Sequence, residues 1–314
     1  MSKIQDALGK IQRTRPPAAG VAAPEQEDSM ILAKLVDRGA KAPSYGVSDK
    51  CLHVDGDALR TAGLIAPEYH EQLLANQYRD IKRPLIAHAF GKRATKVHNG
   101  NLIMVTSAVS GEGKTFTSIN LALSMARERD YSVLLVDADV AKPHTSEMFG
   151  AASEPGLLDL LETNSAHVQS MILPTDVENL SVLPAGKPRL NATELLASGA
   201  METLCETLAN LEEGQLVVFD SPPVLQTSEA KVLAGFTGQV VVVVKAEETA
   251  QDAVVAAVGT LGTEKAVCMV LNQMRMKDGG HQYSYGYGYG YGYGYAKEES
   301  GSPESVDEKK GLFD

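Results

Sequence analysis

The chain has 314 residues and a formal net charge of −11, with 44% hydrophobic and 22% charged residues. This composition is typical of globular proteins, and the length allows one large α/β domain with appendages or two modest domains. The negative charge argues against a nucleic-acid partner, because such binding depends on clustered Lys and Arg. The three cysteines, Cys51, Cys205 and Cys268, are far apart, which argues against a disulfide framework or a zinc site and predicts a reducing cytoplasm.

Residues 1–29 are expected to form a short helix followed by a flexible linker. Ile4, Leu8 and Ile11 recur at helical spacing beside basic residues, which predicts either a helix that docks on a partner or an anionic membrane surface, or a helical end without such a role. The segment 15–29 has linker composition. No uncharged apolar run approaches the ~18 residues that span a bilayer, and no secretory apolar region begins the chain, so the protein is not expected to cross a membrane by itself.

Residues 30–99 are interpreted as an N-terminal extension with oligomerisation or docking helices. Its first part, residues 30–66, is expected to be loosely structured. The sequence pattern of residues 67–90 predicts a pair of helices. The pair is expected to be interrupted or kinked before Pro84, because proline disrupts the interior of a helix.

Between residues 100 and 275, short apolar runs alternate with amphipathic helical patterns. This alternation predicts an α/β fold with a doubly wound, mostly parallel sheet and helices on both faces. Strands of such a sheet are buried on both faces, which explains their nearly continuous apolar sequences. The predicted strands are 102–107, 132–138, 180–184, 216–220, 239–245 and 266–272.

The segment AVSGEGKT has the form of a P-loop, with Ala108 in place of the first glycine, and stands between a predicted strand and a predicted helix. Gly111 and Gly113 allow backbone N–H groups to close around phosphate oxygens. Lys114 is expected to neutralise the β- and γ-phosphates, and the Thr115 hydroxyl to hold Mg²⁺. The predicted nucleotide contacts in this segment are Ser110, Gly111, Glu112, Gly113, Lys114, Thr115 and Phe116.

Three aspartates stand where predicted strands end. Asp137 and Asp139 share one side of an extended segment, and Asp220 ends another apolar run. The carboxyl ends of parallel strands line a ligand crevice, and like charges there are unfavourable without a cation such as Mg²⁺. We therefore predict a metal site made by Thr115 and these three aspartates, although an isolated pair of aspartates is also compatible with a solvated turn. Asn272, at the end of the last strand, is expected either to contact adenine or to cap the strand end.

Residues 276–314 are predicted to be a disordered, tyrosine-rich tail. Tyrosine occupies every second position of one stretch, separated by serine once and then by glycine: Tyr283, Tyr285, Tyr287, Tyr289, Tyr291, Tyr293 and Tyr295. Such a stretch is compatible with an edge strand, with self-association, or with a series of phosphate acceptors. Alternating glycine disfavours the strand, because glycine loses the most backbone entropy and offers nothing to pack.

In combination, these segments resemble the bacterial protein tyrosine kinases of capsule and exopolysaccharide loci. TSAVSGEGKTFTSINLALSMA, VLLVDADVAKP, GLLDLL, LPAGKPRLNATELLAS and FDSPPVL follow in that family's order, and the resemblance covers roughly residues 70–295. The start of the chain and the YGYGYG tract look closer still to the tyrosine autokinases of PEP-CTERM/exosortase-associated exopolysaccharide loci.

The resemblance implies a P-loop NTPase fold of the MinD/ParA-like, deviant-Walker type, with ATP and Mg²⁺ as cofactors. It implies catalytic roles for Lys114, Asp137, Asp139 and Asp220, one of the first two aspartates being near the incoming tyrosine hydroxyl. The tract tyrosines would be the acceptors, phosphorylated by a neighbouring subunit of a ring, possibly an octamer, that forms in the unphosphorylated state. Further implied partners are a chain-length-determinant membrane protein as activator and a tyrosine phosphatase, which would place a cytoplasmic protein at the inner face of the plasma membrane.

Two positions depart from the family pattern. Ala141 stands where the family usually carries Arg after the second aspartate, and Lys142 follows it. Asn76 stands three residues before Arg79, where the family's oligomerisation helix carries Glu. Because of the first departure, less positive charge is expected next to the phosphates. The second departure weakens the prediction of a ring.

Two other functions are compatible with parts of the sequence. A MinD/ParA-like switch ATPase shares the fold and the aspartates, but it carries a signature lysine where this chain has Val109. A self-associating scaffold would use the Gly-Tyr tract but would leave the P-loop and its aspartates without a purpose. Kinase activity accounts for both features.

Overall fold

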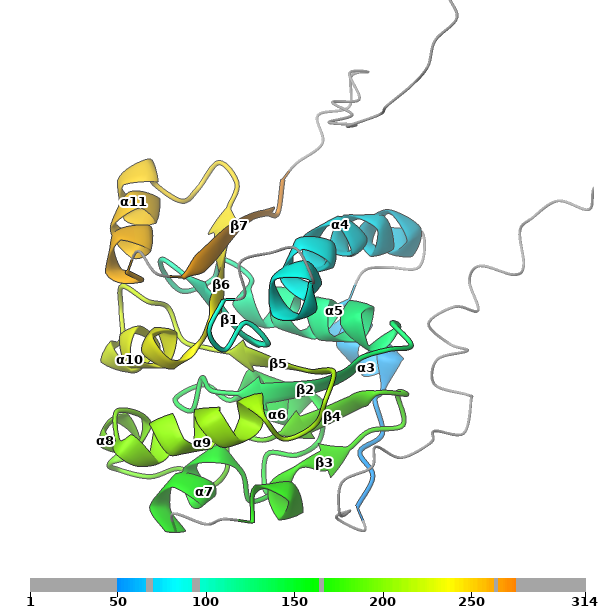
Figure 1. The fold of residues 1–314 in the computed structure, drawn as a ribbon. Coiled ribbons are helices and arrows are strands. Elements are labelled where there is room, and N and C mark those ends of the chain that lie inside the picture. The colour runs from blue at the N-terminus through cyan, green and yellow to red at the C-terminus, as the bar shows by residue number, and fades with distance from the viewer. Residues whose placement is uncertain (1–49, 66–69, 92–96, 164–166, 263–264, 275–314) are drawn as a thin grey trace, which may run out of the picture. The chain divides into compact units, whose positions relative to one another are not determined.

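The structure is a computed structural model that describes residues 50–65, 70–91, 97–163, 167–262 and 265–274 (Figure 1). The described residues belong to the first of two compact units, 1–275, and the second unit is 276–314. The predicted N-terminal helix, the linker and the tyrosine tract lie outside the described residues.

The described residues form a seven-stranded sheet with the order β3-β4-β2-β5-β1-β6-β7. The strands are β1 (Leu102–Ser107), β2 (Ser132–Asp137), β3 (Leu173–Pro174), β4 (Leu180–Leu183), β5 (Gln215–Asp220), β6 (Gln239–Lys245) and β7 (Ala266–Asn272). Neighbouring strands are parallel except β3 and β4. All six predicted strands are confirmed, with ends that differ by at most one residue. The two-residue β3 is too short to leave an apolar run in the sequence and was not predicted.

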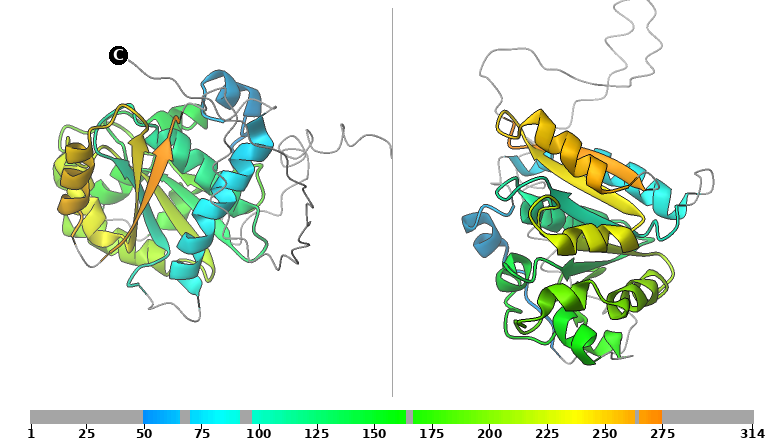
Figure 2. Two further views of the ribbon diagram at one scale, coloured as in Figure 1. Left: turned by 90° about the horizontal axis from the view of Figure 1, so that it is seen from above. Right: turned by 90° about the vertical axis from the view of Figure 1, so that its left-hand side faces the viewer.

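Helices cover both faces of this sheet, so the doubly wound fold is confirmed (Figure 2). On one face lie α3 (Gly56–Thr61), α4 (Glu71–Phe90) and α5 (Lys114–Ala126). The other face is covered by α7 (Leu157–Thr163), α8 (Ala192–Leu196), α9 (Gly199–Ala209), α10 (Ser228–Phe236) and α11 (Gln251–Thr260). The short α6 (His144–Met148) follows β2, and a 3₁₀ helix (Val168–Met171) precedes β3.

Two apolar clusters hold these layers together, one on each face of the sheet. In β1, Leu102 and Met104 pack into the cluster under α7 to α11, whereas Ile103 and Val105 pack into the cluster under α3 to α5. All four side chains are fully buried. Because successive residues of a strand point to opposite faces, a strand buried on both sides must be apolar throughout.

Residues 67–90 were predicted to form a pair of helices, interrupted or kinked before Pro84. The predicted interruption is wrong, because Glu71–Phe90 is one continuous helix, α4, with Pro84 inside it. Pro84 is exposed, while Tyr78, Lys82 and Leu85 on the opposite side are buried. Lys82 donates to the carbonyl of Ser124 and forms an ion pair with Glu128 at 2.8 Å. Packing on both sides of the proline therefore outweighs the one backbone hydrogen bond that it removes.

The expectation of loose structure for residues 30–66 does not hold for the part that the structure describes, residues 50–65. Leu52, Val54, Leu59 and Ile65 are buried in the cluster under α3 to α5. The backbone of Leu52 donates to Pro174 and accepts from Asp176, so the segment is also joined to the chain beside β3.

Candidate active site

The predicted P-loop connects β1 to α5 at the carboxyl edge of the sheet. Gly111 and Gly113 have φ values of 86° and 95°, the left-handed region that favours glycine. A Cβ at Gly113 would lie 2.0 Å from Nδ2 of Asn272, so another residue there would be strained by the backbone angle and would also displace this side chain. The loop ends at the start of α5, where free backbone N–H groups favour an anion. The conformation is that of a phosphate-binding loop.

Glu112 holds this loop in place from within. Its side chain is 2% exposed, one oxygen accepts the backbone N–H of Val109 at 2.8 Å, and the other accepts the hydroxyl of Thr249. Its backbone carbonyl accepts Nδ2 of Asn272 at 2.9 Å. Glu112 and Asn272 thus contact the loop and its surroundings, and contact of either residue with a nucleotide stays a prediction. No local sequence pattern identifies Thr249 as a contact of this loop.

The other predicted nucleotide contacts lie around the same loop. Ser110 is exposed, and its hydroxyl donates to the side-chain oxygen of Gln226 at 2.7 Å. Phe116 is partly buried and packs against the cluster under α3 to α5. Lys114 is 9% exposed, and its positive charge acts on both Asp139 and Asp220. The structure therefore brings the predicted lysine and aspartates together.

Asp137 and Asp220 are neighbours across the sheet, because β2 and β5 are parallel and these two residues are partners in register. Their side chains are 0% and 1% exposed. Burial, followed by the negative charge of Asp220, raises the pKa of Asp137 to about 8. Burial also raises the pKa of Asp220, while hydrogen bonds from Thr145 and Thr115 act in the opposite direction. Two buried acids at adjoining strand ends disfavour each other's ionisation unless a cation is present.

Asp139 is the most accessible of the three aspartates and is partly exposed. Its pKa is also raised by burial, and the positive charge of Lys114 is the largest influence in the opposite direction. The backbone N–H of Lys142 donates to its backbone carbonyl at 2.9 Å. Ala141 and Lys142 are both exposed, so the charged side chain of Lys142 is accessible to solvent next to Ala141.

Three hydroxyl groups that the sequence analysis did not single out contact the buried carboxylates. Ser118 donates to Oδ1 of Asp220 at 3.1 Å, and Thr145 donates to Oδ2 at 2.8 Å. Ser146 donates to Oδ2 of Asp137 at 2.7 Å. Single serines and threonines on helices carry no pattern that would have identified them.

The donor set fits Mg²⁺. Oδ1 of Asp137 is buried and has no hydrogen-bond partner among the described residues, and carboxylate and hydroxyl oxygens are the ligands that Mg²⁺ prefers. In the part of the chain that the structure describes, no three His, Cys, Asp or Glu side chains cluster closely enough to hold a metal by themselves. The described structure therefore does not assemble the three predicted aspartates into a metal cluster, and a Mg²⁺ site that combines one or two of these carboxylates with substrate phosphates stays a prediction.

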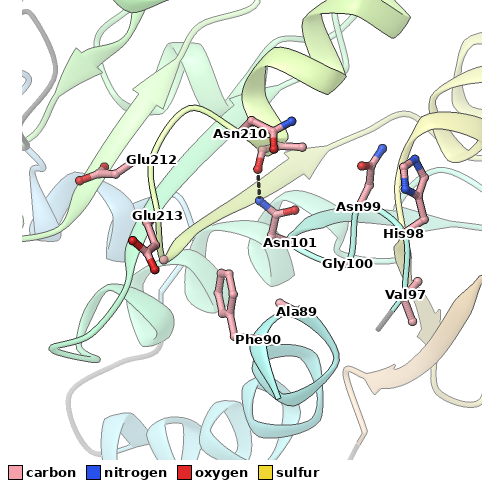
Figure 3. Close-up of a pocket in the computed structure, with 12 residues that line it drawn as sticks. Ala89, Phe90, Val97, His98, Asn99, Gly100, Asn101, Asn210, Glu212 and Glu213 are labelled. Atoms are coloured by element: carbon pink, nitrogen blue, oxygen red, sulfur yellow. Dashed lines mark hydrogen bonds between the residues drawn. The ribbon is translucent and has the colours of Figure 1, made fainter. Parts of the chain in front are cut away.

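A cavity of about 750 Å³ lies at the opposite, amino-terminal edge of the sheet (Figure 3). It is lined by the end of α4 at Phe90, by the turn before β1, and by Glu212 and Glu213 before β5. Asn101 in this cavity donates to the carbonyl of Ala209 at 2.9 Å. None of the predicted site residues lines the cavity, so it is not the candidate active site.

Among the described residues, no helix has the length and apolar character needed to cross a membrane.

Comparison with known proteins places this site in a family. The profile of a family described as an AAA domain matches residues 100–267. The putative tyrosine-protein kinase CapB of Staphylococcus aureus is 34% identical over 183 residues, which are 58% of this chain and 78% of CapB. The tyrosine-protein kinase YwqD of Bacillus subtilis is 33% identical over 204 residues, 65% of this chain and 81% of YwqD. The crystal structure of the VpsO kinase domain aligns with a TM-score of 0.55 at 29% identity, covering 66% of this chain and 99% of that domain.

Other relatives are much longer than this chain. The tyrosine-protein kinase ptk of Acinetobacter johnsonii is 33% identical over 149 residues, and the match covers 20% of its length. The chain thus spans about a fifth of that relative and nearly all of the VpsO kinase domain. The P-loop, the buried aspartates at adjoining strand ends and these similarities together show that the chain belongs to the bacterial tyrosine-protein kinase family.

Proposed function

We propose that the chain is an ATP-dependent protein-tyrosine kinase that phosphorylates its own C-terminal tyrosine cluster in trans and so regulates exopolysaccharide synthesis or export. The observation that carries the proposal is the convergence of a P-loop lysine with three carboxylates, two of them buried at the ends of adjoining strands. The names of the relatives, CapB and YwqD among them, support tyrosine as the acceptor.

In the proposed reaction, the P-loop N–H groups and Lys114 hold the phosphates of ATP. Asp137 and the Thr115 hydroxyl would hold Mg²⁺, with Asp220 acting through Thr115, and the ion would neutralise phosphate charge. The phenolic oxygen of tyrosine attacks the γ-phosphorus, the bond to the ADP oxygen breaks, and the phenolic proton passes to Asp139. We assign this last role to Asp139 because it is partly exposed, whereas the other two aspartates are buried and hydrogen-bonded.

Tethering supports the tract as the acceptor. A covalently attached acceptor needs no folded recognition site, because tethering raises its effective concentration to roughly millimolar. Glycine beside each tyrosine keeps the hydroxyl groups accessible, and seven equivalent tyrosines make any one dispensable.

Mass spectrometry of the C-terminal peptide after incubation with Mg·ATP tests the proposal. Wild type is expected to gain several tyrosine phosphates, a Tyr289→Phe variant nearly as many, and a variant with all seven tract tyrosines changed to Phe almost none. Mixing Lys114→Met chains with chains of the seven-substituted variant tests transfer in trans, because only the first supplies acceptors and only the second supplies an active site. ATP hydrolysis with an unmodified tail would contradict the kinase proposal and favour a switch ATPase.

We further propose that the unphosphorylated protein is a ring-shaped homo-oligomer that loosens on phosphorylation. Each phosphate adds about −1.5 to −2 charge at neutral pH, so seven would add roughly −10 to −14. The chain already carries −11, so repulsion between neighbouring copies would increase steeply. Light scattering should give a larger particle mass for phosphatase-treated protein than for phosphorylated protein. Equal masses would end this part of the proposal.

The proposed place of action is the inner face of the plasma membrane, where a chain-length-determinant membrane protein would dock the kinase and activate it, and a tyrosine phosphatase would reset it. The support is the resemblance to kinases of exopolysaccharide loci. Co-purification of the protein with such a membrane protein from detergent-solubilised membranes tests the docking, and its absence there would count against it.

A further inference from the structure

Two consecutive residues of α6, Thr145 and Ser146, are buried behind the active site and contact different aspartates. Thr145 is 0% exposed and Ser146 is 1% exposed. The hydroxyl of Thr145 donates to Oδ2 of Asp220, on β5, at 2.8 Å. The hydroxyl of Ser146 donates to Oδ2 of Asp137, at the end of β2, at 2.7 Å. One short helix thus contacts both buried carboxylates.

The proton of the Ser146 hydroxyl has one direction available. The backbone N–H of Ala185, just after β4, donates to this hydroxyl at 2.9 Å and occupies an acceptor position on the oxygen. A serine hydroxyl has a single proton to donate, and here it is directed to Asp137. The backbone N–H of Ala185 therefore fixes the Ser146 hydroxyl on one side, and this hydroxyl fixes the Asp137 carboxylate on the other.

The hydrogen bonds to Asp137 all reach the same oxygen. The backbone N–H of Ser146 also donates to Oδ2 at 2.7 Å, so this oxygen accepts two bonds from one residue. Oδ1 is buried and has no partner among the described residues. Charged hydrogen-bond acceptors are seldom left in this state, and an unpartnered carboxylate oxygen beside a P-loop points to a missing cationic ligand.

Asp220 has the opposite arrangement. Its Oδ2 accepts from Thr145, and its Oδ1 lies 3.1 Å from the Ser118 hydroxyl, whose single proton is shared with the carbonyl of Lys114 at 3.0 Å. The hydroxyl of Thr115, the first helical residue after Lys114, also contacts this carboxylate. Both oxygens of Asp220 thus have hydroxyl partners, while Oδ1 of Asp137 has none in the part of the chain that the structure describes.

We propose that Thr145 and Ser146 are positioning residues that divide the roles of the two buried carboxylates. Ser146 holds Oδ2 of Asp137 so that Oδ1 is the oxygen available to Mg²⁺, whereas Thr145 and Ser118 hold Asp220 so that it acts on the metal through the Thr115 hydroxyl. Neither residue touches nucleotide or acceptor. The inference rests on the proposed nucleotide- and Mg²⁺-binding function of the site, but not on the identity of the acceptor.

The test is the Mg²⁺ dependence of nucleotide binding, measured with a fluorescent ADP analogue and no acceptor turnover. Ser146→Ala should raise the Mg²⁺ concentration for half-maximal enhancement of binding by about tenfold, because the carboxylate loses its fixed orientation. Affinity for the analogue in EDTA should stay within a factor of two of wild type. Thr145→Val should raise the Mg²⁺ requirement by about threefold or less, since Ser118 still donates to Asp220.

Two further variants make the test robust. Ser146→Cys keeps a side-chain donor, although a weaker one on a larger atom, and should raise the Mg²⁺ requirement several-fold, with thermal unfolding of each variant showing which of the two is folded. Thr163→Val is the matched control, because it removes a hydroxyl that donates to the backbone of Asp159 on α7 and should leave the Mg²⁺ dependence unchanged.

The inference is overturned if folded Ser146→Ala or Ser146→Cys protein keeps the Mg²⁺ dependence of wild type. It is also overturned if affinity in EDTA falls by the same factor as affinity in Mg²⁺, which would indicate a purely structural role. A wild-type protein that binds Mg·ADP but leaves its tyrosines unmodified would contradict the kinase proposal and leave this inference standing.

Discussion

Lys114→Met is expected to reduce tyrosine phosphorylation of the tail by on the order of 10²–10³-fold. Lys114 is 9% exposed and stands at the start of α5, where its charge acts on Asp139 and Asp220. Methionine keeps much of the length of the side chain but removes the charge, so the developing charge on the transferred phosphoryl group would lose one of the cations proposed to stabilise it. The measurement is the initial rate of phosphotyrosine formation at saturating Mg·ATP.

Lys142→Met provides the matched control for this loss. Lys142 is exposed, so its removal should lower the rate by no more than about tenfold. A Lys114→Met rate within threefold of wild type would show that the P-loop lysine does not support the reaction. A larger loss for Lys142→Met than for Lys114→Met would indicate that Lys142, and not Lys114, makes the main contact with the phosphates.

Asp137→Asn is expected to abolish phosphorylation and at the same time to stabilise the nucleotide-free protein. Asp137 is fully buried beside Asp220, and its pKa is raised to about 8 by burial and by that neighbouring charge. Asparagine keeps the shape and can still accept the hydrogen bonds of Ser146 without a titrating group. We expect the free energy of unfolding at pH 7 to increase by about 1–3 kcal/mol, because folding no longer has to protonate a carboxyl that is ionised at this pH in the unfolded chain.

The pH dependence of this gain has a definite sign. An acid whose pKa is raised on folding contributes stability that is present below its unfolded pKa, about 4, and is lost as the pH rises towards its folded pKa. The advantage of Asp137→Asn should therefore be small near pH 4 and grow up to about pH 8. Denaturant unfolding of both proteins across this range, without Mg²⁺ or nucleotide, is the measurement.

Asp159→Asn is the control, because Asp159 is also buried but has partners. It is 9% exposed, pairs with Arg189 at 2.9 Å, and accepts the backbone N–H groups of Gly156 and Lys187. Loss of its charge should lower the free energy of unfolding rather than raise it. If both substitutions destabilise the protein to the same extent, the raised pKa of Asp137 does not represent a stability cost.

The order of the strands along the chain could be predicted from sequence because fully buried parallel strands leave continuous apolar runs. Regions that are held in place by long-range packing could not be predicted in this way. Pro84 indicated an interruption under a local rule, but Tyr78 and Leu85 are buried on either side of it and keep α4 continuous. Leu52 and Val54 have no periodic pattern, and only their neighbours in space show that they belong to the core.

The residues of the candidate site also fall into those that the sequence predicts and those that only the structure identifies. Lys114, Thr115 and the three aspartates belong to segments with characteristic local spacing, so the sequence alone predicts them. Ser118 and Thr145 lie 102 and 75 residues from the aspartate that they contact, and Thr249 lies 137 residues from Glu112. These hydroxyl groups can be identified as part of the site only from the structure, in which the sheet brings the strand ends together.

The two edges of the sheet differ in whether another strand could join them. At one edge, β3 has two residues, and Pro174 has no N–H to donate. At the other edge, β7 has seven residues, and Val267, Met269 and Leu271 are exposed in alternation. Sheet growth is therefore one-sided among the described elements, and a lysine on the exposed face of β7 is the kind of substitution that would discourage unwanted pairing there while leaving the carboxyl-edge chemistry untouched.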